Sequence, residues 1–405
     1  MNNFKIGYSE LLTPSKVESP VFNRATKAII NLNTYKDNLL KVKEAVNKKV
    51  MAIVKANAYG HGIVPLSVEA EEVVNSFGVA IIEEASMLRK AGIKKPILVL
   101  GYVDPEYLPY VANEGIRVAL YSYDQWKKWQ EQIFKKNRLT KKSVIFHLKI
   151  NTGMNRLGFK SEEEMLKTIQ EIEATQGVYT EGLFTHFATA DEPGDSLIAQ
   201  QENTFLDMIS KLEKDKYIVH IANSAYALNR ETKVPFDMVR LGISSYGLLP
   251  DSKLENQLKV TTEPILQLKT KIVHIQELKA GDKVGYGATY EAKEGERVGV
   301  IPIGYADGLL RRYALNAYVL VNGERRYFTG RVCMDQAMIK LEPKDCLEDE
   351  VVIYGEQGRE KVSLEMAADW SNSINYELAC LISERVHRVY TKWKQGFFLK
   401  RKRTI

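Results

Sequence analysis

Short apolar runs alternate with amphipathic stretches between residues 50 and 241. The eight runs are residues 50–54, 77–82, 97–100, 117–121, 144–150, 179–185, 217–221 and 237–241. Runs of this kind are typical of parallel strands that are buried on both faces. Helical spacing of apolar residues recurs between them, at residues 83–91, 123–136, 162–174 and 197–211. Eight strands alternating with helices predict an α/β protein with a (β/α)8 barrel, although a miscount by one strand would leave a doubly wound sheet open.

The pattern changes after about residue 262, where short strand-like segments follow one another with turns between them. Asn322-Gly323, flanked by residues 318–321 and 326–328, is typical of a two-residue hairpin turn. We therefore predict a second, mainly antiparallel β domain with short helices near residues 363–370 and 377–384. The predicted organisation is an N-terminal arm (1–25), the barrel (26–261), the β domain (262–390) and a basic tail (391–405).

Composition is that of an ordinary globular protein, with 405 residues of which 45% are hydrophobic and 27% charged. No apolar run approaches the ~18 residues that span a bilayer, and the first residues lack a secretory signal pattern, so we expect a cytoplasmic protein without membrane contact. The net charge of +6 equals the charge of the tail alone, which has six Lys and Arg residues and no acid between positions 391 and 405. Such a tail is usually solvated surface, and we expect no nucleic-acid partner.

Cysteine and histidine spacing argues against two further classes of protein. The three cysteines show no CxxC spacing, which disfavours a disulfide framework or a zinc ribbon. The six histidines show no HxxxH spacing. We therefore expect no metal site.

Polar residues follow several predicted strands at their carboxyl ends. They are Lys55 and Tyr59, Lys149 and Arg156, His186, Ser224, and Arg240 with Gly242. In a barrel these ends share one rim, and ligands bind there. A lysine desolvated at the rim can act as a nucleophile or base, although on spacing alone a lysine that merely extends to solvent is the commoner case. Each of the other residues has an ordinary structural explanation, but together they indicate one pocket.

The segment around Lys55 reads VMAIVKANAYGHG over residues 50–62. It resembles the cofactor-lysine signature of the alanine racemases, and further matches extend to Arg388, so the resemblance covers almost the whole chain. This resemblance implies a barrel followed by a β domain, the cofactor pyridoxal 5'-phosphate, and a racemase that interconverts L-alanine and D-alanine. It also implies an obligate head-to-tail homodimer with composite active sites.

The resemblance assigns catalysis to two residues. Lys55 would form the aldimine with the cofactor and serve as the base on one face of the substrate. Tyr286, in the segment VGYGATY of residues 284–290, would be the second base and would reach the active site of the partner subunit. His186 would connect Tyr286 to Arg240. Because a guanidinium cannot accept a proton, Arg240 facing the pyridine nitrogen would leave that nitrogen unprotonated.

Further residues match the family's cofactor and substrate contacts. The phosphate would be held by Tyr59, Ser224, Tyr376 and the backbone N–H groups of Gly242 and Ile243. The substrate side would consist of Arg156, the backbone N–H of Met334, the neighbouring Asp335, and Tyr305 at the entrance. Lys149 matches a lysine that is often carbamylated in the family, which would turn a cation beside Arg156 into an anion.

Some residues depart from the family's pattern, and other functions stay open. Asn151 stands where many relatives have aspartate, and Ser244 and Ser245 where an apolar pair is commoner, so the polarity of the pocket is undecided. The alternatives are a racemase for serine or a basic amino acid, a decarboxylase of the same architecture, and a non-catalytic pyridoxal-phosphate-binding protein. Tyr376, which narrows the pocket in the family, favours alanine. The expected role is D-alanine supply for peptidoglycan in a bacterium.

Overall fold

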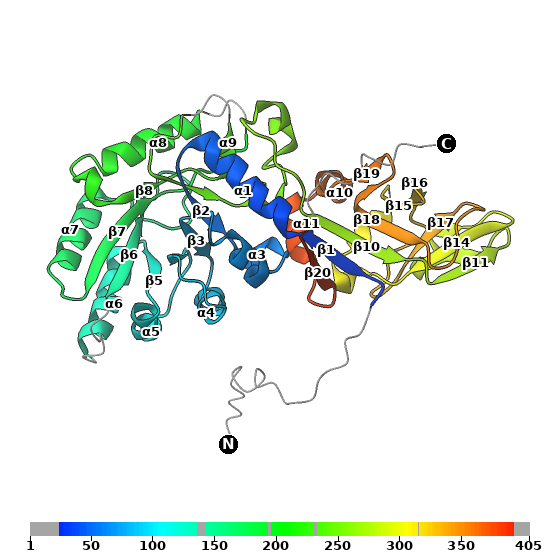
Figure 1. Ribbon diagram of the computed structural model, residues 1–405, viewed down its shortest axis with the longest axis horizontal. Coiled ribbons are helices and arrows are strands. Elements are labelled where there is room, and N and C mark those ends of the chain that lie inside the picture. The colour runs from blue at the N-terminus through cyan, green and yellow to red at the C-terminus, as the bar shows by residue number, and fades with distance from the viewer. Residues whose placement is uncertain (1–23, 136–142, 193–195, 230–232, 315, 393–405) are drawn as a thin grey trace, which may run out of the picture.

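The computed structural model describes residues 24–135, 143–192, 196–229, 233–314 and 316–392. The expected N-terminal arm and basic tail therefore lie almost entirely outside the described residues. Figure 1 shows two parts, a barrel surrounded by helices and an elongated β domain beside it. The prediction of a barrel followed by a mainly antiparallel β domain is confirmed.

All eight predicted barrel strands are present. They are β2 (Lys49–Ile53), β3 (Ser76–Val79), β4 (Ile97–Val99), β5 (Ile116–Leu120), β6 (Val144–Lys149), β7 (Val178–Phe184), β8 (Ile218–His220) and β9 (Met238–Leu241). The strands pair in parallel in the order β8-β7-β6-β5-β4-β3-β2-β9. The gap between β8 and β9 is bridged where the Asp237 N–H donates to the Val219 carbonyl (3.0 Å) and the Arg240 N–H to the Ala222 carbonyl (2.9 Å). The carboxyl ends of the strands consequently share one rim.

Helices cover the outside of the barrel (Figure 1). They include α1 (Leu32–Val46), α3 (Ile63–Ala70), α4 (Ile82–Lys90), α5 (Leu108–Asn113), α6 (Tyr123–Lys135), α7 (Glu162–Glu173), α8 (Leu197–Met208) and α9 (Ser224–Leu228). In α7, the Ser161 hydroxyl caps the first turn by accepting from the Glu164 N–H, and Met165, Ile169 and Ile172 are buried. By contrast, β6 is buried at every position, including His147 and Lys149 within its mostly apolar sequence.

The β domain contains two main sheets. Its strands are β10 (Leu266–Lys271), β11 (His274–Leu278), β12 (Lys283–Val284), β13 (Tyr290–Glu291), β14 (Glu296–Ile301), β15 (Tyr318–Val321), β16 (Glu324–Tyr327), β17 (Ala337–Leu341), β18 (Glu350–Gln357), β19 (Glu360–Val362) and β20 (His387–Thr391), with helices α10 (Leu364–Ser371) and α11 (Asn375–Leu381). One sheet has the order β16-β15-β18-β10-β1-β20, with β19 beside β18, and the other is β11-β14-β17.

Strand β1 (Lys27–Asn31) ties the two parts of the chain together. It pairs antiparallel with β10 and parallel with β20, so the first described strand belongs to the sheet of the β domain, and the chain then enters the barrel through α1. Residues 27–31 fall within the range that we expected to form the barrel. The predicted hairpin at Asn322-Gly323 is confirmed, with φ angles of 52° and 77° that fit a two-residue turn between β15 and β16.

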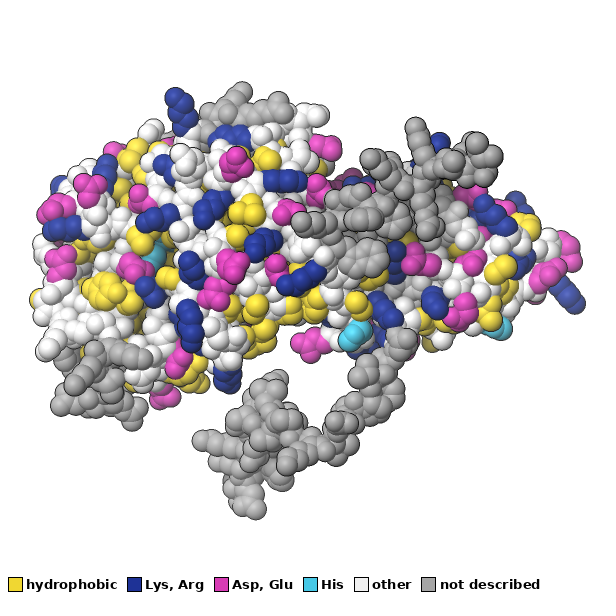
Figure 2. Space-filling view, in the orientation of Figure 1, with side chains coloured by type: hydrophobic (Ala, Val, Ile, Leu, Met, Phe, Trp, Pro, Cys, Tyr) yellow, Lys and Arg dark blue, Asp and Glu magenta, His cyan; other side chains and the backbone are white. Residues whose placement is uncertain are grey.

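The surface carries charges of both signs. Figure 2 shows Lys and Arg side chains interspersed with Asp and Glu side chains over the visible face of the barrel. Within the described ranges, no helix combines the length and apolar character needed to cross a bilayer.

Candidate active site at the mouth of the barrel

Lys55 lies at the start of an unusual turn that follows β2. Ala56, Asn57, Ala58 and Tyr59 all have left-handed backbone angles, with φ between 51° and 53°. For a residue with a side chain this conformation costs about 1–2 kcal/mol, and Asn tolerates it better than Ala or Tyr. Gly60 and Gly62 also have positive φ angles, of 79° and 104°. The structure places the start of the turn four residues before Gly60, directly after the lysine.

Neighbouring elements hold this turn in place. The Glu84 carboxylate on α4 accepts a hydrogen bond from the Ala56 N–H (2.6 Å), and the Asn57 side chain accepts from the Ile63 N–H (2.8 Å). The Arg388 guanidinium donates twice to the Gly60 carbonyl, at 2.9 and 3.1 Å. These contacts from α4, α3 and β20 compensate the strained backbone, so the turn depends on the assembled fold rather than on local propensity.

Five of the predicted site residues gather at the carboxyl ends of the barrel strands. Burial lowers the pKa of His186 well below its usual value, and four surrounding cations lower it further. These cations are Arg240, Arg156, Lys149 and Lys55. His186 Nδ1 lies 3.1 Å from Arg240 Nη2, and its implied contact with Tyr286 stays a prediction. The rim therefore carries a concentrated positive charge next to an imidazole that is neutral at neutral pH.

Arg240 is buried and is held by neutral partners. Its guanidinium donates to the Thr185 carbonyl (2.6 Å), to the Ile221 carbonyl (3.1 Å) and to the His220 carbonyl. Burial, followed by the charge of Arg156, lowers the pKa of Arg240 to about 9, which leaves it protonated at neutral pH. Among the described residues no carboxylate forms an ion pair with it. A buried cation without a direct counterion fits a site that receives an anionic or electron-rich ligand.

The two lysines at the rim have altered proton affinities. Burial, followed by the charge of Arg156, lowers the pKa of Lys55 from its usual value. The same two causes, in the same order, lower the pKa of Lys149 to about 8. Both amines therefore release a proton more easily than a lysine in water, which suits Lys55 for attack on a carbonyl and for proton transfer.

The predicted phosphate contacts lie side by side. The Gly242 N–H donates to the Ser224 hydroxyl (3.0 Å), just before the 3-10 helix Ile243–Tyr246. A Cβ on Gly242 would lie 2.8 Å from the Tyr59 phenol oxygen, so the glycine allows the phenol to approach. The rings of Tyr59 and Tyr376 are 6.1 Å apart. Two phenols, a hydroxyl and backbone N–H groups at a helix start form a donor set that fits a phosphate group. The Lys55 amine on the same rim suits a ligand that carries an aldehyde as well as a phosphate.

Three segments of the β domain carry the remaining predicted residues. The Tyr305 N–H donates to the Cys333 carbonyl, and the Ala306 N–H donates to the Met334 carbonyl, each at 3.0 Å. These bonds join the turn at Tyr305 to the loop of residues 330–336. Asp335 forms an ion pair with Arg385 at 2.6 Å. A Cβ on Gly287 would meet the Arg331 guanidinium at 2.8 Å, which places the turn after Tyr286 against the same loop.

These β-domain residues are open to solvent in the single chain. The exposed fractions are 70% for Tyr286, 52% for Met334 and 45% for Tyr305. The structure thus brings together two groups of predicted residues, one at the barrel rim and one on the β domain, and leaves the second group uncovered.

Sequence reasoning did not single out several residues that support the site. Glu84, Arg385 and the buried pair His147 and His220 were not predicted to contribute. The histidines did leave a signal, because each is a buried polar residue in a mostly apolar strand. Glu84 and Arg385 left none, since an acid in a first helical turn and a surface arginine are ordinary.

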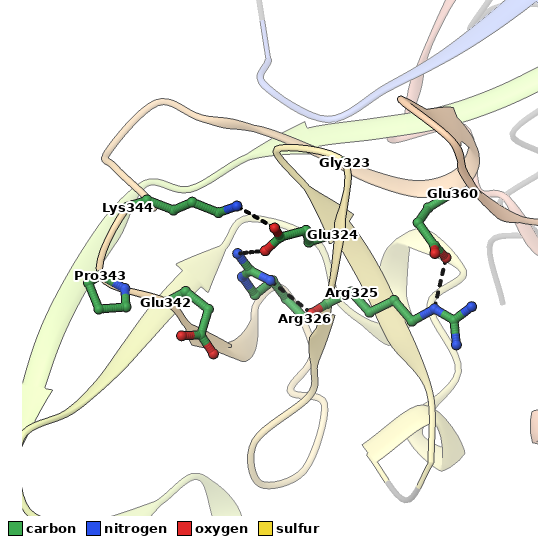
Figure 3. Close-up of a pocket in the computed structure, with 8 residues that line it drawn as sticks. All are labelled: Gly323, Glu324, Arg325, Arg326, Glu342, Pro343, Lys344 and Glu360. Carbon is green, nitrogen blue, oxygen red and sulfur yellow. Dashed lines mark hydrogen bonds and ion pairs between the residues drawn. The ribbon is translucent and has the colours of Figure 1, made fainter.

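A shallow groove on the β domain is a weaker candidate for a ligand site (Figure 3). It is lined by Gly323, Glu324, Arg325, Arg326, Glu342, Pro343, Lys344 and Glu360. Glu324 pairs with Lys344 and with Arg326, and Arg325 pairs with Glu360 at 2.8 Å. Because these charges largely neutralise one another, the groove offers much less to a charged ligand than the barrel rim does.

Comparison with known proteins gives consistent matches along the chain. The family profile for the alanine racemase N-terminal domain matches residues 30–250, and the profile for the alanine racemase C-terminal domain matches residues 265–390. The alanine racemase of Anoxybacillus flavithermus is 40% identical over 378 residues, which are 92% of this chain and 96% of that protein. The crystal structure of alanine racemase from E. faecalis has a TM-score of 0.86 at 36% identity, covering 91% of this chain and 98% of that one. A histidine racemase from Leuconostoc mesenteroides subsp. sake has a TM-score of 0.84 at 30% identity, covering 92% and 99%.

Proposed function

Because the chain belongs to the alanine racemase family, we propose that it interconverts L-alanine and D-alanine with pyridoxal 5'-phosphate bound at the barrel mouth. The observation that carries this proposal is the arrangement around His186. Lys55, Arg156 and Arg240 surround it, and the hydroxyl and N–H groups that could bind a phosphate lie on the same rim. Bound pyridoxal phosphate withdraws electrons from the amino acid and makes its Cα–H acidic.

The chain's own residues then supply binding and proton transfer. The Lys55 amine, whose pKa burial lowers, holds or accepts a proton at Nζ on one face of the substrate. Arg240 can only donate hydrogen bonds, so a pyridine nitrogen bound against it would stay unprotonated. Arg156 and the Met334 N–H bind the substrate carboxylate, and Asp335 and Tyr305 shape the substrate side. The phosphate is held by Tyr59, Ser224, Tyr376, Gly242 and Ile243.

The second proton-transferring group in this proposal is the Tyr286 phenol of a partner subunit. Inversion at Cα requires a proton to leave from one face and to arrive at the other, so one base is not enough. The exposure of Tyr286 (70%), together with that of Met334 and Tyr305, supports a head-to-tail homodimer in which the β domain of one protomer covers the barrel mouth of the other. His186, bonded to Arg240, is the barrel-side partner proposed for that phenol.

Alanine is the proposed substrate, and a larger amino acid is the second candidate. Tyr376 has its ring centroid 6.1 Å from that of Tyr59 at the rim, and we propose that it narrows the space beside the substrate side chain. The structure is also similar to that of a histidine racemase. A closely similar fold can therefore act on a larger amino acid, so larger amino acids are included in the test. The proposed setting is the bacterial cytoplasm, with D-alanine going to peptidoglycan.

Chiral analysis of the purified protein tests this proposal. The protein loaded with pyridoxal phosphate is incubated with L-alanine and, separately, with D-alanine, and Lys55→Ala is treated in parallel. Both incubations are expected to converge on an equal mixture, and Lys55→Ala is expected to leave each enantiomer unchanged. Serine, histidine and lysine are tested alongside. If one of these amino acids is racemised faster than alanine, that amino acid and not alanine is the substrate. Release of carbon dioxide would indicate a decarboxylase.

We also propose that Lys149 is carbamylated. Its pKa of about 8 leaves part of the amine neutral at neutral pH, which is the form that reacts with carbon dioxide, and the product would face Arg156 as an anion. The intact mass of the native protein, measured with and without bicarbonate, is expected to show an added carboxyl group that Lys149→Met lacks. A bare amine in both conditions would contradict this proposal.

A further inference from the structure

A line of hydrogen-bonded side chains, here called the relay, runs through the barrel interior from Arg240 through His220, His147 and Glu181 to Arg117. His220 Nδ1 lies 3.1 Å from Arg240 Nη1, and His220 Nε2 lies 2.8 Å from His147 Nδ1. His147 Nε2 lies 3.0 Å from the Glu181 carboxylate. Glu181 in turn receives two hydrogen bonds from Arg117, at 2.9 and 3.0 Å. The line therefore connects the cation at the active-site rim with an ion pair at the other end of the barrel strands.

The chemistry of its two ends fixes the direction of every bond in this line. A guanidinium has no lone pair to offer, so Arg240 must donate to His220 Nδ1. His220 then carries its proton on Nε2 and donates to His147 Nδ1. By the same rule His147 carries its proton on Nε2 and donates to the ionised Glu181 carboxylate. One tautomer of each imidazole satisfies all these contacts, and a doubly protonated ring would place two donors face to face.

The surroundings favour this neutral arrangement. Both histidines are almost fully buried, and burial lowers the pKa of His147 and holds that of His220 well below its usual value. Burial raises the pKa of Glu181, but the hydrogen bonds from His147 and Arg117 outweigh it and bring the value to about 2. Phe184 stacks on His220 with ring centroids 4.9 Å apart. A Cβ on Gly182 would lie 2.4 Å from His147 Nδ1, so the glycine makes room for the ring.

We propose that His220, His147 and Glu181 are positioning residues that act through Arg240. This inference rests on the proposed function, in which Arg240 faces the pyridine nitrogen. A carboxylate in direct contact with Arg240 would cancel the positive charge that attracts an anionic cofactor and substrate to the rim. The relay instead holds Arg240 through two neutral rings that end on the Glu181–Arg117 ion pair, so it places no negative charge at the rim. Arg240 thus stays fixed and protonated while the rim stays positive.

The Glu181 end of the relay lies beside a small cavity, and the Arg240 end does not. About 190 Å³ of space is lined by Arg117, His147, Glu181 and neighbouring residues from the amino-terminal ends of the strands. Glu181 is only partly buried, so its charge is kept where solvent can approach it, whereas Arg240 is buried. Because of this difference in burial, an ionised carboxylate loses less solvation free energy at the position of Glu181 than it would beside Arg240.

The first test observes the tautomers directly and does not depend on activity. Nitrogen NMR of the pyridoxal-phosphate-loaded protein labelled with 15N-histidine reports which ring nitrogen carries the proton. Signals are assigned with His147→Gln and His220→Gln. We expect His147 and His220 to be neutral, each with its proton on Nε2, at pH 7.5. A proton on Nδ1 of His220, or a doubly protonated ring at either position, would overturn the relay. A chain that is not a racemase could still pass this test, so the two proposals can fail separately.

The second test asks whether His147 positions Arg240 through its hydrogen bonds or only fills space in the barrel interior. His147→Leu removes the acceptor for His220, and kcat is expected to fall by about 10- to 100-fold, the loss expected from one hydrogen bond in a chain ending on a charge. His147→Gln, whose amide both accepts and donates, is expected to recover most of kcat. Glu181→Gln should lower kcat, whereas Glu171→Gln, a matched change between α6 and α7, should not. Equal kcat values in the Leu and Gln variants, at wild-type cofactor content, would contradict the positioning role.

Discussion

Replacing Gly60 by alanine tests how the turn after Lys55 is held. Gly60 has φ of 79°, and a Cβ there would lie 2.0 Å from the Ala379 carbonyl oxygen and 2.9 Å from its carbon. These are backbone atoms of α11, so no side-chain rotation relieves the contact. The left-handed backbone costs about 1–2 kcal/mol and overpacking about 1–3 kcal/mol, which together predict a loss of about 2–5 kcal/mol in the free energy of unfolding.

Gly92→Ala is the matched control for this change. Gly92 has φ of 90°, but no atom lies within 4 Å of a Cβ there, so only the backbone cost of about 1–2 kcal/mol applies. Urea unfolding at one protein concentration measures both variants, with and without pyridoxal phosphate. Gly60→Ala should also weaken cofactor binding, because α11 carries Tyr376. Equal destabilisation by the two substitutions, with unchanged cofactor affinity, would refute the packing argument.

Two further changes have defined outcomes. Since the pKa of Lys149 is lowered from 10.5 to about 8, the unfolded chain binds more protons than the folded chain between these pH values, and the free energy of unfolding should rise with pH across that window. Urea titrations of cofactor-free protein in carbon-dioxide-free buffer should show this rise, and an equal slope in Lys149→Met would contradict it. Arg385→Ala removes the partner of Asp335 in the substrate loop and should raise KM for alanine by about 2- to 5-fold with little change in kcat, because the pair is exposed. A fall in kcat with KM unchanged would count against this role.

The barrel could be predicted from the hydrophobic pattern because parallel strands covered on both faces are apolar over most of their length. The eight runs fell on the eight strands, and Asn322-Gly323 marked its hairpin because only a few residues tolerate two successive positive φ angles. The positions of Lys55, Arg156, His186 and Arg240 at one rim followed from the strand order alone.

The turn after Lys55 could not be predicted in this way. Ala56, Ala58 and Tyr59 have no preference for a left-handed backbone, and the bonds that impose it come from Glu84 and Arg388, far away in the sequence. His147 and His220 were visible as polar residues in apolar strands, but their pairing depends on the closure of the barrel. The role of Tyr286 came from the family resemblance and not from any pattern, and it stays a prediction.

The most direct test of the proposed composite, two-base site combines two inactive variants. Lys55→Ala and Tyr286→Ala are each expected to be inactive, since every site of either homodimer lacks one base. Co-expression with different affinity tags allows the mixed dimers to be isolated, and each mixed dimer should contain one intact site and one doubly defective site. Chiral analysis should then show about half of the wild-type activity per mixed dimer. Mixed dimers that remain inactive, or a Tyr286→Ala homodimer as active as wild type in both directions, would contradict the account.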